Sequence, residues 1–196
     1  MHRGKYFSTS SYYDRVFDTN GVKILPGQYY ATTENSVITT VLGSCVSVCL
    51  YDAVNGVGGM NHYMLPGDPE GNGKTGSGSA RYGIHAMKLL LQHLFQLGAA
   101  PGNLAAKVFG AGKVMDGMSD VGRQNADFAL GFLKDEKIRI AAVDVGDIYP
   151  RKICFYPATG RVFVKRIKNQ ALSPELMQVL LPPVACSDTA YMRIQG

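Results

Sequence analysis

Alternating hydrophobic and polar positions predict a chain with many short strands and two main helices. Strand-like runs cover residues 22–25, 29–31, 37–41, 45–51, 57–65, 104–109, 138–145, 153–156 and 162–167. Apolar side chains recur at helical spacing over residues 80–97 and 121–134, with a shorter helical pattern over 173–181. Because helices and strands do not alternate strictly, the pattern favours an α/β mixed-sheet layered sandwich over a doubly wound parallel sheet.

The chain divides into one domain and two extensions. Residues 1–20 are polar and show no periodicity, so we expect a flexible N-terminal extension. Residues 21–168 hold the predicted helices and strands of the single domain, and residues 169–196 form a C-terminal extension with a short helix and a tail. Residues 66–79 are rich in glycine and predict a long exposed loop. Their Gly-Lys-Thr lacks the upstream glycine that a phosphate-binding loop requires.

Charge and composition exclude several classes of protein. The net charge is +5, but the positive side chains are scattered, which is more typical of a solvated surface than of a nucleic-acid-binding face. We expect neither nucleic-acid binding nor membrane insertion, since no apolar run approaches the ~18 residues that a membrane span needs. The N-terminus lacks the apolar core of an export signal, so we expect a cytoplasmic protein with reduced thiols.

Two of the four cysteines lie close together, Cys45 and Cys49. The spacing of the cysteines and histidines does not fit a metal site, and we expect no metal and no cofactor. In a straight strand, Cys45 and Cys49 would be ~13 Å apart, too far for a direct disulfide. Gly43-Ser44 before Cys45 allows a sharp turn that exposes the thiol and the adjoining N–H, as a nucleophile requires. A packed core cysteine is the alternative for Cys45 and the preferred interpretation for Cys49.

His62 lies in the strand-like run that could pair with the run containing Cys45. A histidine within reach would take the thiol proton, and the resulting ion pair would hold a reactive thiolate. A structural histidine bonded to a backbone carbonyl is the alternative. Asn61 should face the opposite side of the strand, and Thr39 is close enough in sequence to approach the site.

These residues lie in a sequence that resembles a known family. The run TTVLGSCVSVCLYD followed by GVGGMNHYMLP resembles CheD, the chemoreceptor glutamine deamidases of bacterial and archaeal chemotaxis. The likeness continues through SARYGIHAMKLLLQHLFQLGA, LAAKVFGAG, VGRQNADFALGFL, IAAVDVGD and TGRVFVKRI, over residues ~22–168.

The resemblance implies an α/β layered sandwich with a Cys-His-Thr triad, which corresponds here to Cys45, His62 and Thr39. It implies a cofactor-free hydrolysis of glutamine side-chain amides in methyl-accepting chemotaxis receptors, through a thioester. Backbone N–H groups around Ser44 are the expected oxyanion donors. A CheC-type phosphatase is the implied partner, and we expect a monomer when the protein is unbound.

Two loops depart from the family pattern, at Gly110-Ala111-Gly112 and at residues 147–151. We expect both loops to lie away from the triad, so they affect the expected partner surfaces more than the catalysis. Two other functions stay open at this point. One is a CheD-like regulatory module that binds CheC or a receptor, and the other is a cysteine esterase acting on receptor glutamate methyl esters.

Overall fold

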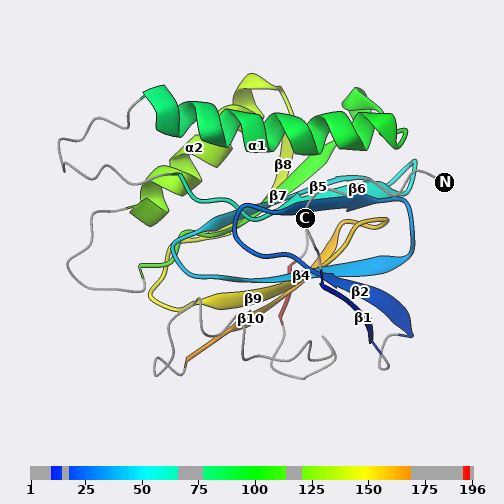
Figure 1. Cartoon of the computed structure of the whole chain (residues 1–196), viewed down its shortest axis with the longest axis horizontal. Coiled ribbons are helices and arrows are strands. Elements are labelled where there is room, and N and C mark those ends of the chain that lie inside the picture. Colours follow the sequence, from blue (N-terminus) through cyan, green and yellow to red (C-terminus); the bar gives the residue numbers. More distant parts are fainter. Residues whose placement is uncertain (1–9, 15–17, 66–76, 114–120, 169–191, 195–196) are drawn as a thin grey trace.

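Two β-sheets lie face to face, and both helices cover the other side of one of them (Figure 1). The structure is a computed structural model that describes residues 10–14, 18–65, 77–113, 121–168 and 192–194. The layers are therefore helices, helix-covered sheet and outer sheet. The mixed α/β layered sandwich expected from the sequence is confirmed.

Within the described residues, the helix-covered sheet has five strands and the outer sheet has six. The order in the helix-covered sheet is β3 (Tyr29–Thr32), β6 (Val57–Asn61), β5 (Val46–Asp52), β7 (Ala105–Gly110) and β8 (Arg139–Val145). The order in the outer sheet is β1 (Ser10–Asp14), β2 (Thr19–Lys23), β4 (Ser36–Leu42), β9 (Arg151–Tyr156), β10 (Arg161–Arg166) and β11 (Met192–Ile194). The β2–β4 and β7–β8 pairs are parallel, and the others are antiparallel.

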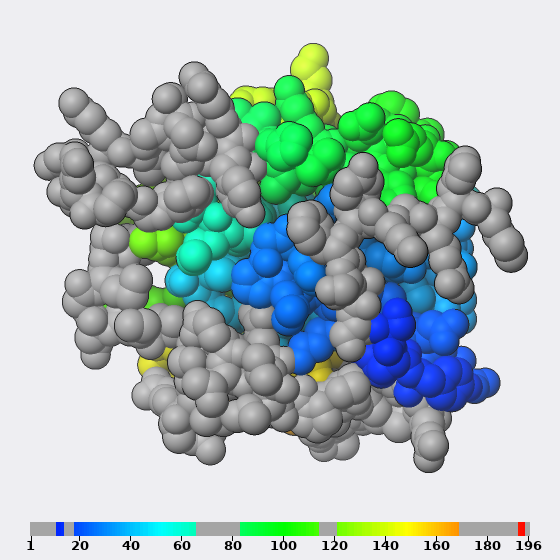
Figure 2. Space-filling view, in the orientation of Figure 1, coloured from blue at the N-terminus to red at the C-terminus, as the bar shows by residue number. Residues whose placement is uncertain are grey.

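Each sheet face packs against a different layer. Helices α1 (Ser77–Gln96) and α2 (Val121–Asp135) pack on the helix-covered sheet, and a 3₁₀ turn, Pro101–Asn103, leads into β7. Side chains alternate along β5, so that Val48 and Leu50 face the helices whereas Cys49 and Tyr51 face the outer sheet. Both faces of β5 are buried, which explains its nearly continuous hydrophobic sequence. In Figure 2, the green surface that includes α1 borders lighter blue surface from the N-terminal part of the chain.

The elements expected from the sequence are present with small shifts at their ends, and two strands lie outside the expected domain. β1 falls in the polar segment 1–20, and β11 falls in the C-terminal extension. β1 pairs with β2 and β11 pairs with β10, so both extend the outer sheet. Strands of this kind form because a neighbour offers backbone groups, which a hydrophobic pattern does not reveal. The short helix expected at 173–181 lies outside the described residues.

Asp52, at the end of β5, joins two loops through a buried carboxylate. It accepts hydrogen bonds from the N–H groups of Val54 and Asn55 (both 3.0 Å) in the β5–β6 turn and of Ala100 (2.9 Å) after α1. The Asn55 side-chain amide donates a fourth bond at 2.6 Å. Burial alone would raise the pKa of Asp52, but the hydrogen bonds outweigh it and lower the pKa to about 2.

We expect the Asp52→Asn variant to lower the free energy of unfolding by about 1–2 kcal/mol, because an amide N–H₂ would then face backbone donors. The folded-state pKa of about 2 lies below the ordinary 3.8, so the carboxylate's contribution is complete above pH 3.8 and is lost as the pH falls toward 2. Urea unfolding should therefore show a difference between variant and wild type that shrinks in this window.

The matched control is Asp127→Asn. Asp127 forms an exposed pair with Arg123 at 3.7 Å, and such pairs contribute about 0–1 kcal/mol. Equal effects of the two substitutions at neutral pH would contradict a structural role for the Asp52 carboxylate.

Candidate active site

Cys45 and His62 lie on the same face of the helix-covered sheet. Val46, the first residue of β5, and Tyr63, two residues after β6, exchange two backbone hydrogen bonds of 3.0 and 2.9 Å. In this antiparallel register, Cys45 and His62 are diagonal neighbours, and both face the outer sheet. Cys45 packs against the core between the sheets and is partly exposed, whereas His62 is fully buried.

The imidazole of His62 is held by a residue of the other sheet. Its Nδ1 lies 2.7 Å from Thr40 Oγ1, and the same hydroxyl donates to the carbonyl oxygen of Ile24 at 2.9 Å. A hydroxyl has one proton to donate, so Thr40 must accept the proton of Nδ1–H. This sets the tautomer, with an unprotonated Nε2. Nε2 is buried and has no hydrogen-bond partner within the part of the chain that the structure describes.

Burial also determines the charge of this imidazole. It lowers the pKa of His62 to about 3, because an imidazolium ion would be poorly solvated there. The imidazole is therefore neutral at neutral pH. This favours a neutral thiol–imidazole pair in the free protein over the ion pair expected from the sequence. His62 has the state of a general base that receives the thiol proton during attack.

Thr39, the residue assigned to the triad by resemblance, faces the opposite side of β4. Thr40 lies between Ile38 and Leu42, whose side chains belong to the core between the sheets. Val37 packs in a separate cluster on the outer face, and alternation places Thr39 on that face with it. The hydroxyl that contacts His62 therefore belongs to Thr40, one position after Thr39, the residue that the resemblance implies.

Three successive carbonyl groups anchor the turn that carries Cys45. The oxygens of Gly43 and Cys45 accept hydrogen bonds from the N–H groups of Gly112 and Ala111, both at 2.8 Å. The oxygen of Ser44 accepts one from the Asn125 side chain at 3.0 Å. Gly110, before Ala111, has a φ of +114°, and a Cβ there would overlap the carbonyl oxygen of Cys45.

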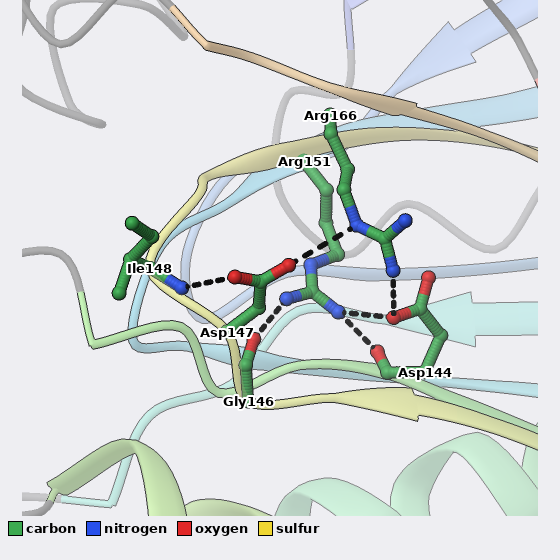
Figure 3. A network of polar contacts seen from close by, with 6 residues as sticks. All are labelled: Asp144, Gly146, Asp147, Ile148, Arg151 and Arg166. Atoms are coloured by element: carbon green, nitrogen blue, oxygen red, sulfur yellow. Dashed lines mark hydrogen bonds and ion pairs between the residues drawn. The ribbon is translucent and has the colours of Figure 1, made fainter.

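A network of charged side chains supports the loop that follows β8 (Figure 3). The fully buried guanidinium of Arg151 donates to the Asp144 carboxylate at 2.7 Å and to the carbonyl oxygen of Gly146, and Arg166 pairs with Asp144 at 3.3 Å and Asp147 at 3.4 Å. The backbone of this loop bonds in turn to the end of β7. Gly146 N–H donates to the Gly110 carbonyl (2.9 Å), and the Asp147 carbonyl accepts from Lys113 (2.8 Å). The network thus stabilises the segment that anchors the Cys45 turn. The expectation that the Gly110-Ala111-Gly112 loop lies away from the triad is wrong, because its N–H groups bond to the Cys45 turn.

The other cysteines in the described part of the chain do not compete as nucleophiles. Cys49 is buried between the sheets, and burial raises the pKa of its thiol. This agrees with the core role expected for it. Cys154 is disulfide-bonded, so the expectation of reduced thiols is wrong for this residue. Among the described residues, Cys45 therefore carries the one partly exposed thiol that is not in a disulfide.

The described residues were compared with the requirements of a metal site and of a membrane-spanning helix. Within the described ranges, no group of three or more His, Cys, Asp or Glu side chains could hold a metal ion. The two helices described are too short or too polar to cross a membrane.

Sequence reasoning missed two site residues, Thr40 and Asn125. Thr40 directly follows Thr39 in the sequence. Side chains alternate along β4, so the two threonines face opposite sides, but the sequence does not show which side faces inward. Asn125 is a fully buried asparagine inside α2, within the VGRQNADFALGFL run that supported the resemblance. A polar residue on the apolar face of a helix was its only signal. The expectation for Asn61 is confirmed, since its amide contacts Met87 of α1 on the other side of the strand.

Comparison with known proteins connects this site to a family. The model of the family described as CheD chemotactic sensory transduction matches residues 64–166. The chain is 51% identical over 170 residues to a probable chemoreceptor glutamine deamidase CheD of Janthinobacterium sp. (strain Marseille), covering 84% of this chain and 82% of the relative.

Two further relatives have the same description. A probable chemoreceptor glutamine deamidase CheD of Methylobacillus flagellatus is 50% identical over 165 residues (83% of this chain, 81% of the relative). A probable chemoreceptor glutamine deamidase CheD 1 of Shewanella oneidensis is 53% identical over 160 residues (81% and 78%). The resemblance inferred from the sequence is confirmed, and this chain belongs to the CheD family.

Proposed function

We propose that this protein is a protein-glutamine glutaminase that converts glutamine side chains of methyl-accepting chemotaxis receptors to glutamate, with Cys45 as its nucleophile. The observation that carries the proposal is the sheet face that His62 shares with the partly exposed Cys45 thiol. The buried Nε2 of His62 has no hydrogen-bond partner among the described residues. Burial lowers the pKa of His62, which supports the role of a neutral base. The names of the family relatives supply the substrate class.

The first half-reaction forms a thioester. His62 Nε2 takes the proton of the Cys45 thiol as the sulfur attacks the side-chain carbonyl carbon of a receptor glutamine. The carbonyl oxygen becomes an oxyanion, for which the backbone N–H groups around Ser44 and Cys45 are the proposed donors. When the intermediate collapses, the protonated imidazole gives its proton to the departing nitrogen. Ammonia leaves, and the acyl group stays bonded to the Cys45 sulfur.

The second half-reaction consumes water. Neutral His62 removes a proton from a water molecule as its oxygen attacks the thioester carbon. Collapse of this intermediate releases a glutamate side chain and returns the proton to the Cys45 sulfur. Thr40 accepts the Nδ1–H bond throughout, which keeps Nε2 available for each proton transfer. The new carboxylate adds a negative charge to the receptor and creates a site for methylation.

Three further expectations from the sequence analysis stay predictions. They are binding to a CheC-type phosphatase, a monomeric state when unbound and a cytoplasmic location. Size-exclusion chromatography with and without a CheC-type protein addresses the first two.

The central experiment incubates the protein with cytoplasmic receptor fragments and measures ammonia release together with Gln→Glu mass shifts. We expect conversion by the wild type and loss of at least about 10³-fold in rate for Cys45→Ala, because the nucleophile is removed. The matched control, Cys49→Ala, should remain active if it folds, because that thiol is buried packing.

The outcomes separate the alternative functions. Receptor or CheC binding without ammonia release would favour a regulatory binding module. Methanol release from methylated receptors without ammonia release would favour a methylesterase. Equal conversion by Cys45→Ala and the wild type would rule out the proposed mechanism.

A second pair of variants tests which threonine orients His62. Thr40→Val should lower kcat by about 10- to 100-fold with little change in KM, since the imidazole loses the acceptor that holds its tautomer. Thr40→Ser keeps the hydroxyl and should recover most of the activity. Thr39→Val is the matched control, with kcat expected within about 2-fold of the wild type. The reverse order of effects, with Thr39→Val the impaired variant, would return the orienting role to Thr39.

A further inference from the structure

Asn125 connects α2 to both strands of the candidate site through one side-chain amide. Its Nδ2 donates to the carbonyl oxygen of Ser44 at 3.0 Å, and its Oδ1 accepts the N–H of Leu65 at 2.8 Å. Its backbone carbonyl accepts the hydroxyl of Tyr63 at 2.7 Å. The side chain is fully buried, so these bonds replace the water that a polar group would otherwise need.

The two partners of the amide flank the reacting groups. Ser44 directly precedes Cys45, and Leu65 lies three residues after His62 on the paired segment. The Asn125 side chain therefore holds both the turn before Cys45 and the segment after His62 against α2. Asparagine is a weak helix former, and these contacts offset the free-energy cost of placing it inside α2.

The bond to Ser44 also determines how the next peptide N–H points. The Ser44 carbonyl and the Cys45 N–H share one planar trans peptide, in which the two groups point in opposite directions. Asn125 draws the carbonyl toward α2, on the helix side of the sheet. The Cys45 N–H is consequently turned toward the opposite side, where the Cys45 side chain and His62 face the outer sheet.

Ser44 differs from its neighbours in how its carbonyl is held. The carbonyl groups of Gly43 and Cys45 are held by backbone N–H groups, which no substitution of a side chain removes directly. The Ser44 carbonyl is held by a side chain. The orientation of the peptide beside the nucleophile thus depends on one replaceable residue.

We propose that Asn125 is a positioning residue for Cys45 and His62, which sets the Ser44–Cys45 peptide plane and the separation of the two segments without touching substrate. For turnover this inference rests on the proposed deamidase function. The reactivity of the Cys45 thiol gives a second readout that needs no receptor.

The test compares Asn125→Asp with Gln124→Glu, the same chemical change at the neighbouring, partly exposed position of α2. Asn125→Asp is nearly isosteric and keeps an acceptor for Leu65 N–H, but it places a carboxylate oxygen against the Ser44 carbonyl. We expect kcat for deamidation to fall about 10- to 100-fold with KM within about 2-fold, because small displacements of reacting groups carry costs of this size. Gln124→Glu should leave both constants within about 2-fold of the wild type.

Iodoacetamide alkylation of Cys45, followed by mass spectrometry, tests the proposal even if no receptor is deamidated. We expect the Cys45 alkylation rate to change at least about 3-fold in Asn125→Asp and to stay at the wild-type value in Gln124→Glu. Circular dichroism and thermal unfolding verify the fold, and if Asn125→Asp does not fold, the uncharged Asn125→Ser takes its place with the same expectations. A folded variant with wild-type alkylation rate and wild-type kcat would overturn the proposal. A wild type that fails to deamidate while the alkylation change persists would remove the proposed function and leave the positioning role.

Discussion

The hydrogen bond between His62 and Thr40 is the constraint on which the site depends, because it joins the two sheets. His62 follows a strand of the helix-covered sheet, and Thr40 belongs to the outer sheet. The bond forms only if both sheets pack with their inner faces at the correct separation and register. The same hydroxyl donates to Ile24, so the backbone beyond β2 helps determine which nitrogen of His62 carries the proton. The tautomer of His62, the proposed general base, therefore depends on how the two sheets pack together.

The Cys45 side of the site depends on the opposite layer of the molecule. The Gly43–Cys45 turn is anchored by the end of β7 and by Asn125 of α2, whereas His62 is oriented by the outer sheet. The Arg151 network extends this support to the loop after β8. All three layers thus contribute contacts to the candidate pair Cys45 and His62. Hydrogen bonds between buried groups are stronger than in water, so these contacts favour a single arrangement of the three layers.

Hydrophobic periodicity was sufficient to predict most of the helices and strands, because both helices and the central strands bury regular apolar faces. It was insufficient for β1 and β11, which are short and polar and form by pairing with a neighbour at the edge of the outer sheet. The Thr39-Thr40 pair shows the same difficulty within the site. Both residues are β-branched and strand-compatible, and only the packing of β4 shows which hydroxyl faces His62.

The sequence by itself determined the family, the mixed layered architecture and the candidate pair Cys45 and His62, because these depend on local patterns and on a glycine-serine break before the cysteine. Tertiary structure alone decided that Thr40 holds the imidazole, that burial keeps His62 neutral and that Asn125 connects the two segments. These features arise between residues distant along the chain. Their hydrogen bonds and solvent exclusion exist only after the layers have packed together.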